Sequence, residues 1–368
     1  MKKIRVLEFE LTENMGGVES LLCSVDKRIN KKIFEIDFIA TQYAPYQEDL
    51  KEIGSKIFLL PSIKKIILYV KSLNQILNNN YDIVHFNKNS LANSLPILIS
   101  KYHPTHPKII IHSHNTAPTH NILGLKFLHF VNKTILRSVP DYKIACSGEA
   151  KKWMFFSKDN VEIINNGIDT KKFKFSEIKR SKIRHKLGIS DDTVLIGNVG
   201  RFNRQKNHVG LIKIFANLAN NTDKYKLLLI GKGDEMQKIK SLVKENQLNK
   251  KVIFVDNTSV VDEYLSAMDI FLMPSLYEGL PLAAVEAQAA GLQVFVSDNI
   301  SKEVYLTSYI YPISLKWDEG KISTFIKQKY QELNYDERKR QANVVHNKDF
   351  DLLDTTDKFE KVYENIIN

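Results

Sequence analysis

Cysteine and long apolar runs are both scarce in this chain of 368 residues. Its two cysteines, Cys23 and Cys146, are too few for a disulfide framework or a cysteine-based zinc site. No apolar run approaches the ~18–20 residues that a membrane-spanning helix needs. The basic N-terminus, residues 1–5, precedes only a short apolar stretch that Glu8 and Glu10 interrupt, which argues against a signal peptide. We therefore expect a soluble or peripheral protein of a reducing, cytoplasmic compartment.

Acidic residues are scarce in the first half of the chain only. Residues 1–185 contain 29 Lys and Arg against 17 Asp and Glu, whereas residues 186–368 contain 24 against 25. The net charges of the two halves are therefore +12 and −1, so the first half is the better candidate to meet an anionic surface. With 43% hydrophobic and 26% charged residues the chain can bury a large core, and its length predicts two or three domains.

Short apolar, β-branched segments alternate with stretches of helical length. This alternation predicts an α/β fold in which parallel sheets are covered by helices on both faces. The polar, lysine-rich segment 169–190 lacks a strand signal, and we expect it to be a linker between domains at 1–180 and 190–340, with a C-terminal helix at 341–368. We expect strands at residues 4–9, 36–40, 57–60, 83–86, 109–112, 142–146, 161–164, 194–199, 226–230, 252–255, 270–273 and 294–296.

Two cations follow the first strand of the second half. Arg201 and Lys206 lie in a loop between a strand and a helix, where a guanidinium and an ammonium together suit a diphosphate. Two solvated surface cations explain the same residues equally well. Gly231 follows the next strand, and a glycine there lets backbone N–H groups approach a ligand. A tight strand-to-helix turn is the more ordinary explanation of this glycine.

The most informative segment is 274–291. Pro281 suits the first position of a helix over residues 281–290. Glu278 lies just before this helix, whose N-terminus attracts anions. Because a carboxylate repels phosphate, Glu278 suits the hydroxyl groups of a sugar, and Glu286 inside the helix suits those of a ribose. A solvent-facing helical glutamate is the alternative for Glu286.

The first half contains a glycine turn and a histidine pair. Gly16 and Gly17 join the first strand to a helix, where they allow a bound group to approach the backbone, although a plain tight turn also explains them. His112 and His114 follow a strand. Two histidines this close could be part of a metal site, but no third ligand lies at a sequence spacing typical of one, so we expect no metal. One of them can instead bind substrate, and a structural histidine is the equal alternative.

Together these segments resemble the family 4 glycosyltransferases, which use nucleotide-sugar donors and have the GT-B architecture of two Rossmann-like domains facing a cleft. The residues Ser297-Asp298-Asn299 and Glu303 resemble the version found in bacterial capsule and exopolysaccharide enzymes. The matching segments are, in order, Gly16-Gly17-Val18-Glu19, His112-Ser113-His114-Asn115, Asn166-Gly167-Ile168-Asp169, Gly200-Arg201-Phe202 with Gln205-Lys206-Asn207, and Glu278 with Glu286 eight positions later.

The resemblance implies a retaining transfer, with the leaving phosphate as the base and no divalent metal or cofactor beyond the nucleotide-sugar donor, which we expect to be UDP-linked. Many relatives have glycine where this chain has Pro281, so a backbone N–H contact to the donor is lost there. The resemblance implies catalytic roles for Arg201, Lys206, Glu278 and His114, with His112 the less favoured of the histidine pair, and donor-binding roles for Gly16, Gly17, Gly231, Gly279, Leu280 and Glu286.

The resemblance also implies that the C-terminal helix crosses back to the N-terminal domain and packs there near residues 350–363. It assigns the acceptor to this basic N-terminal domain. A glycan or lipid-linked glycan on an anionic membrane suits that charge, and segment 64–71 is our candidate contact, unless Ile66, Ile67 and Val70 pack inward. We therefore expect a cytoplasmic protein, peripheral on the inner face of the plasma membrane, that binds no nucleic acid. The alternatives are a nucleotide-sugar epimerase of the same architecture and a non-catalytic membrane-docking subunit.

Overall fold

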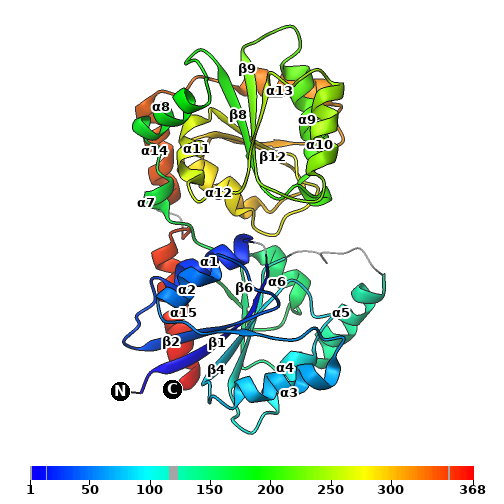
Figure 1. Cartoon of the computed structure of the whole chain (residues 1–368), viewed down its shortest axis with the longest axis vertical. Coiled ribbons are helices and arrows are strands. Elements are labelled where there is room, and N and C mark those ends of the chain that lie inside the picture. The colour runs from blue at the N-terminus through cyan, green and yellow to red at the C-terminus, as the bar shows by residue number, and fades with distance from the viewer. Residues whose placement is uncertain (1, 14, 116–122, 347–348) are drawn as a thin grey trace. The chain divides into compact units, whose positions relative to one another are not determined.

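The computed structural model describes residues 2–13, 15–115, 123–346 and 349–368. The chain divides into two compact units. Unit 1 comprises Met1–Gly167 and Leu352–Asn368, and unit 2 comprises Ile168–Asp351. Each unit contains one parallel β-sheet with helices on both faces (Figure 1). The α/β fold class predicted from the alternation of strands and helices is therefore confirmed.

Unit 1 has a sheet of seven parallel strands among the described residues, in the order β3-β2-β1-β4-β5-β6-β7. Its strands are β1 (Ile4–Leu11), β2 (Phe34–Ala40), β3 (Ile57–Leu59), β4 (Ile83–Lys88), β5 (Lys108–Ser113), β6 (Tyr142–Ala145) and β7 (Glu162–Ile163). Its helices are α1 (Gly17–Asp26), α2 (Gln47–Glu52), α3 (Ile66–Leu77), α4 (Leu95–Lys101), α5 (Leu123–Ile135), α6 (Gly148–Met154) and α15 (Leu352–Ile367).

The last helix of the chain helps to form the core of unit 1. Phe359, Val362 and Tyr363 of α15 pack in one apolar cluster with side chains of α1, β1 and β2, such as Leu21 and Phe34. The expected C-terminal helix 341–368 is therefore two helices in the structure, of which only the second belongs to unit 1. Burial of these apolar side chains attaches the end of the chain to the sheet that its beginning forms.

Unit 2 has a sheet of six parallel strands in the described part of the chain, in the order β10-β9-β8-β11-β12-β13. Its strands are β8 (Val194–Val199), β9 (Tyr225–Ile230), β10 (Val252–Val255), β11 (Ile270–Met273), β12 (Gln293–Ser297) and β13 (Ile310–Ile313). Its helices are α7 (Thr170–Phe173), α8 (Glu177–Lys186), α9 (His208–Leu218), α10 (Met236–Glu245), α11 (Val261–Ala267), α12 (Leu282–Ala289), α13 (Glu319–Lys329) and α14 (Tyr335–His346).

The segment 169–190 is not the linker that its composition predicts. It contains α7 and α8, and α8 packs against α11 within unit 2. Arg180 and Arg184 attach α8 to this unit, since both donate to the carbonyl of Ala267 and to the carboxylate of Asp269. The chain passes from one unit to the other at residues 167 and 168, earlier than the expected 180–190.

No helix among the described residues is long and apolar enough to cross a membrane. Cys23 and Cys146 are both buried, and neither forms a disulfide in the described structure.

Candidate active site

The loops that follow β8 and β11 meet at the carboxyl edge of the unit 2 sheet. β8 and β11 are neighbouring parallel strands, so their carboxyl ends lie at the same edge. Hydrogen bonds join the two loops: Leu276 N–H donates to the carbonyl of Gln205 at 2.8 Å, and Nδ2 of Asn207 donates to the carbonyl of Pro274 at 3.0 Å. Side chains of the two loops are therefore held at fixed positions relative to one another.

Lys206 and Glu278 are in direct contact at this edge. Nζ of Lys206 lies 2.7 Å from Oε1 of Glu278, and Nε2 of Gln205 donates to the other carboxylate oxygen at 3.3 Å. Both charged side chains are largely buried. The stem of the lysine lies against Gly200, where a Cβ atom would come within 3.3 Å of its Cε. The structure thus brings together two of the predicted catalytic residues, and Gln205 is a partner that the sequence analysis did not assign.

Arg201 differs from Lys206 in its surroundings. It is exposed, and its guanidinium makes no hydrogen bond or ion pair with the described residues. Its neighbour Phe202 is fully buried against the ring of His208, with ring centroids 4.1 Å apart. Because the buried Phe202 fixes the backbone of this loop, Arg201 lies at the carboxyl edge of the sheet. Its guanidinium has no ion-pair partner there among the residues that the structure describes.

Glu286 lies in α12 near two lysines. Burial raises the pKa of its carboxyl to about 7, against the lowering influence of Lys172 and Lys206. Lys172 belongs to α7, inside the segment that was expected to be a linker, so composition hid its proximity to the site. Pro281 is the residue before the first turn of α12, not its first helical residue as predicted, since the helix begins at Leu282.

The predicted donor-binding glycines have structural roles that do not depend on a ligand. Gly231 has a φ of +143°, and a Cβ atom there would lie 2.1 Å from the carbonyl oxygen of Gly200. Only glycine fits this close approach of two loops. Gly279 and Leu280 are buried in the turn before α12. These contacts neither require nor exclude a nucleotide at the same edge.

The glycine turn of unit 1 is tied to its own helix. Gly16 is the cap of α1, and its N–H donates to Oε2 of Glu19 at 3.0 Å, while Oγ1 of Thr12 donates to Oε1 at 2.6 Å. Gly17 is the first residue of α1 and is exposed. The turn is thus a capped helix start, with the exposed Gly17 next to it.

His114 belongs to a buried polar network in unit 1. Nδ2 of Asn87 donates to the carboxylate of Glu8 at 2.7 Å, so its Oδ1 atom faces Nε2 of His114 at 2.9 Å. Glu8 also accepts from the hydroxyl of Tyr363 at 2.7 Å and contacts Nδ1 of His85 at 3.0 Å. These partners come from β1, β4 and α15, and no local motif in the sequence points to them.

His112 is fully buried beside His114, with ring centroids 3.8 Å apart. Neither of its ring nitrogens has a hydrogen-bond partner among the residues that the structure describes. Burial lowers the pKa of His112 well below its ordinary value and that of His114 to about 3. Both imidazoles are therefore neutral at physiological pH. The described residues contain no group of three or more His, Cys, Asp or Glu arranged to hold a metal ion.

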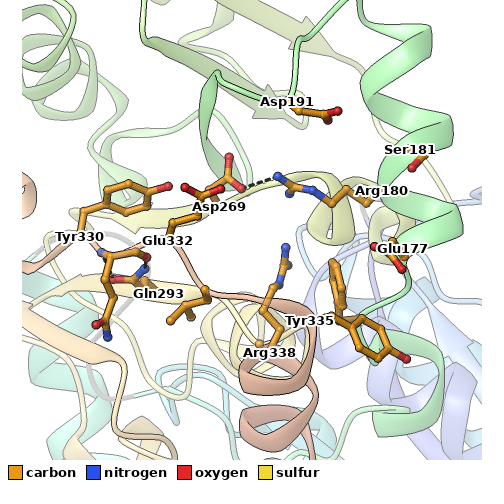
Figure 2. A pocket seen from close by; sticks show the side chains of 14 residues that line it. Glu177, Arg180, Ser181, Asp191, Asp269, Gln293, Tyr330, Glu332, Tyr335 and Arg338 are labelled. Carbon is orange, nitrogen blue, oxygen red and sulfur yellow. Dashed lines mark hydrogen bonds and ion pairs between the residues drawn. The ribbon is translucent and has the colours of Figure 1, made fainter.

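A separate cavity of about 310 Å³ lies in unit 2 beside Asp269 and Gln293 (Figure 2). Asp269 directly precedes β11, and Gln293 is the first residue of β12. The cavity is therefore at the amino edge of the sheet, and none of its lining residues is a predicted site residue. Arg180 pairs with Asp269 at 2.8 Å, and the buried guanidinium of Arg338 donates to backbone carbonyls at the ends of α11 and α12. The cations here are thus engaged in holding the fold.

Two family models match successive parts of the chain. The model described as Glycosyltransferase Family 4 matches residues 15–172, and the model described as Glycosyl transferases group 1 matches residues 179–309. The first covers most of unit 1, and the second covers the Lys206, Glu278 and Glu286 segments of unit 2.

Curated relatives and solved structures agree with these matches. The chain is 28% identical over 318 residues to a Bacillus subtilis protein named glycosyltransferase EpsF, covering 82% of this chain and 80% of the relative. It is 24% identical to an Escherichia coli UDP-Gal:alpha-D-GlcNAc-diphosphoundecaprenol alpha-1,3-galactosyltransferase, covering 80% of each. HepE of Anabaena, solved with UDP and glucose, has a TM-score of 0.80 at 15% identity, covering 98% of this chain and 100% of HepE. The chain therefore belongs to the family 4 glycosyltransferases and has the GT-B fold.

Proposed function

We propose that this glycosyltransferase moves a sugar from a UDP-sugar to a glycan or lipid-linked glycan acceptor, with retention of the anomeric configuration, in surface polysaccharide synthesis. The contact between Lys206 and Glu278 carries the proposal, because it joins a cation suited to a diphosphate with a carboxylate suited to sugar hydroxyls. The E. coli relative is named for a UDP-Gal donor and a lipid diphosphate acceptor, and HepE was solved with UDP, which supports these substrate classes.

In this proposal unit 2 binds the donor through the carboxyl edge of its sheet. Lys206 and Arg201 neutralise the diphosphate, Glu278 accepts hydrogen bonds from the sugar, and Glu286 accepts them from the ribose. The N-terminus of α12 adds a partial positive charge next to Lys206 and Glu278. Pro281 has no N–H, so the residues after it, from Leu282 onward, provide the donors of this helix start.

The reaction breaks the bond between the sugar C1 and the diphosphate oxygen and forms a bond from C1 to an acceptor hydroxyl oxygen on the same face. The acceptor proton passes to the departing diphosphate, so no side-chain base is required. As the bond breaks, negative charge grows on the diphosphate, and Lys206 and Arg201 stabilise it. The neutral His114, with Gly16 and Gly17 of unit 1, would orient the donor, and Gly231, Gly279 and Leu280 would line its site.

Unit 1 would bind the acceptor, which we place on the cytoplasmic face of an anionic membrane. The exposed Lys64, Lys65 and Lys71 support this part of the proposal. Ile66 and Ile67 are exposed as well and Val70 is half-buried, so of these three side chains only Val70 packs inward, in part, as the alternative explanation of this segment requires. The sequence 297–299 with Glu303, which resembles capsule and exopolysaccharide enzymes, supports the surface polysaccharide assignment.

The test is a thermal-shift screen with UDP-, GDP- and ADP-sugars, followed by incubation of the best donor with and without lipid-diphosphate glycan acceptors. We expect UDP-sugars to raise the melting temperature most, since a ligand that binds only the folded state stabilises it. A new glycoside whose anomeric configuration matches the donor is expected only when acceptor is present. An altered nucleotide sugar without acceptor would indicate an epimerase, and no turnover with any donor would indicate a non-catalytic subunit.

A further inference from the structure

Helix α5 has its polar and apolar faces reversed. Its buried residues, in the described structure, are His129 and Asn132, and both are polar. Its large apolar side chains face solvent, with Leu123 85% and Phe127 68% exposed. A helix that packs on a sheet normally buries an apolar stripe and exposes its polar residues. The other exposed apolar side chains of α5 are Leu128, Phe130, Val131 and Ile135.

Hydrogen bonds hold α5 in this orientation. Nδ1 of His129 accepts from the N–H of Leu91 at 3.0 Å, and Nδ2 of Asn132 donates to the carbonyl of the same residue at 2.7 Å. The imidazole of His129 also stacks on Trp153, with ring centroids 3.9 Å apart. The polar face of α5 therefore recognises the rest of unit 1 specifically, and the apolar face is held outward.

Helix α3 exposes apolar side chains on the same side of the unit 1 sheet. Ile66, Ile67 and Leu68 at its start are exposed, Ile67 to 83%. The strand order and right-handed crossovers place α3, α4 and α5 on one face, opposite α1, α2 and α15 (Figure 1). Both α3 and α5 begin at the carboxyl edge of the sheet, because each follows a strand of it.

The two faces of unit 1 also differ in charge. The helices α3, α4 and α5 contain four basic residues, Lys71, Lys101, Lys126 and Lys133, and no acidic residue. The helices α1, α2 and α15 on the opposite face contain nine acidic and three basic residues. The exposed apolar side chains thus lie on the basic face.

We infer that the exposed apolar face of α5, with the start of α3, docks unit 1 on an anionic lipid bilayer. The inference rests on the proposed function, in which the acceptor is carried on such a membrane. Apolar side chains would enter the interface between headgroups and acyl chains, while Lys126 of the same helix and the exposed Lys64 and Lys65 before α3 reach the anionic headgroups. A second copy of the chain fits this face less well, because two-fold pairing would bring two basic surfaces together.

The test is co-sedimentation of the full-length protein with vesicles of phosphatidylglycerol and phosphatidylcholine in equal amounts, compared with vesicles of phosphatidylcholine alone. We expect binding to the mixed vesicles, weakened by high salt. The double variant Phe127→Ser, Phe130→Ser should bind roughly tenfold or more weakly, since it removes two inserted rings. Ile178→Ser on α8 of unit 2 is the matched control, because Ile178 is 83% exposed but lies outside this surface, and it should bind as the wild type does.

Three results would overturn the inference: no binding of the wild type to mixed vesicles, equal loss in both variants, or a wild-type dimer in sedimentation velocity that the double variant abolishes without any vesicle binding. Transfer to a short, water-soluble acceptor without vesicles separates this inference from the proposed function. If transfer proceeds and vesicle binding fails, only the docking surface is wrong. If vesicles bind and no donor is turned over, only the proposed function is wrong. Unchanged circular dichroism of the double variant shows that it folds.

Discussion

Asn87 presents its carbonyl oxygen to Nε2 of His114 at 2.9 Å because its amide nitrogen is committed to Glu8. Nε2 must therefore carry the proton, which leaves Nδ1 of His114 as an acceptor. At present Nδ1 faces the amide nitrogen of Asn166 at 3.5 Å, a long contact that a sugar hydroxyl can replace. The buried carboxylate of Glu8 thus determines, through Asn87, which ring nitrogen of His114 carries the proton.

This arrangement predicts that His114 does not titrate in the physiological range. Its pKa, lowered by burial to about 3, keeps the ring neutral from about pH 5 to about pH 8. In imidazole ¹⁵N–¹H correlation spectra, with the signal assigned through His114→Gln, we expect a constant Nε2–H tautomer over this range. A signal that moves with a midpoint near the ordinary histidine value would contradict the network.

Lys206→Ala is expected to lower the rate of transfer roughly 100-fold or more, because the charge that develops on the diphosphate loses its buried cation. The matched control is Lys213→Ala on the next helix, where the lysine is exposed and pairs loosely with Glu319 at 3.8 Å. Initial rates at saturating donor measure both variants, and thermal unfolding checks their folds. Equal rates for the two variants would remove Lys206 from the mechanism.

The raised pKa of Glu286 predicts that the free energy of unfolding depends on pH. Its folded pKa of about 7 lies above that of an ordinary carboxyl, so its contribution is fully favourable below about pH 4.5 and is lost as the pH rises towards 7. Glu286→Gln should therefore raise the free energy of unfolding at about pH 8 by about 1–2 kcal/mol and make little difference at about pH 5. Melting temperatures of both proteins at the two pH values check this. A gain that is larger at the lower pH would have the wrong sign.

Arg338 is expected to be essential for the stability of unit 2. It is buried, lies over the ring of Phe175 at 3.8 Å and donates to carbonyls at the ends of α11 and α12. Arg338→Met leaves these carbonyls without their donor and should cost about 3 kcal/mol or more. Arg340→Met, an exposed position on the same helix, should change stability by less than about 0.5 kcal/mol. Similar losses in melting temperature for both variants would refute this role.

The bounds of strands are predicted best where apolar residues follow one another closely. The predicted and observed bounds agree for the buried strands β8 and β11 and also for the half-buried edge strand β10, because such apolar runs leave a strong signal. β13 was not predicted. Like β10 it lies at an edge of the sheet, but unlike β10 it contains Pro312, so it lacks one of the N–H donors that a strand normally has.

Helices that attach through polar side chains escaped prediction for a related reason. α8 is held by Arg180 and Arg184, and α5 by His129 and Asn132, so neither shows an apolar stripe towards its sheet. Hydrophobic periodicity is absent from α8, and in α5 it marks a stripe that faces solvent, so it does not indicate how either helix attaches.

The candidate site likewise contains some contacts that the sequence predicts and others that it does not. The proximity of Lys206 to Glu278 follows from two motifs at the ends of adjacent strands, which sequence order and fold class together predict. The partners of His114 do not follow from spacing, because Glu8, Asn87 and Tyr363 meet only when three distant segments fold together. Lys172 was missed because its segment was expected to be a linker and not a part of the second domain.

The most direct test of the central claim is calorimetric titration of UDP into the wild type and into Lys206→Ala, with Lys213→Ala as the control. If the carboxyl edge of unit 2 binds the donor diphosphate through Lys206, the wild type and the control bind UDP alike, and Lys206→Ala binds roughly tenfold or more weakly. Equal affinity in all three proteins would place the diphosphate elsewhere and contradict the account.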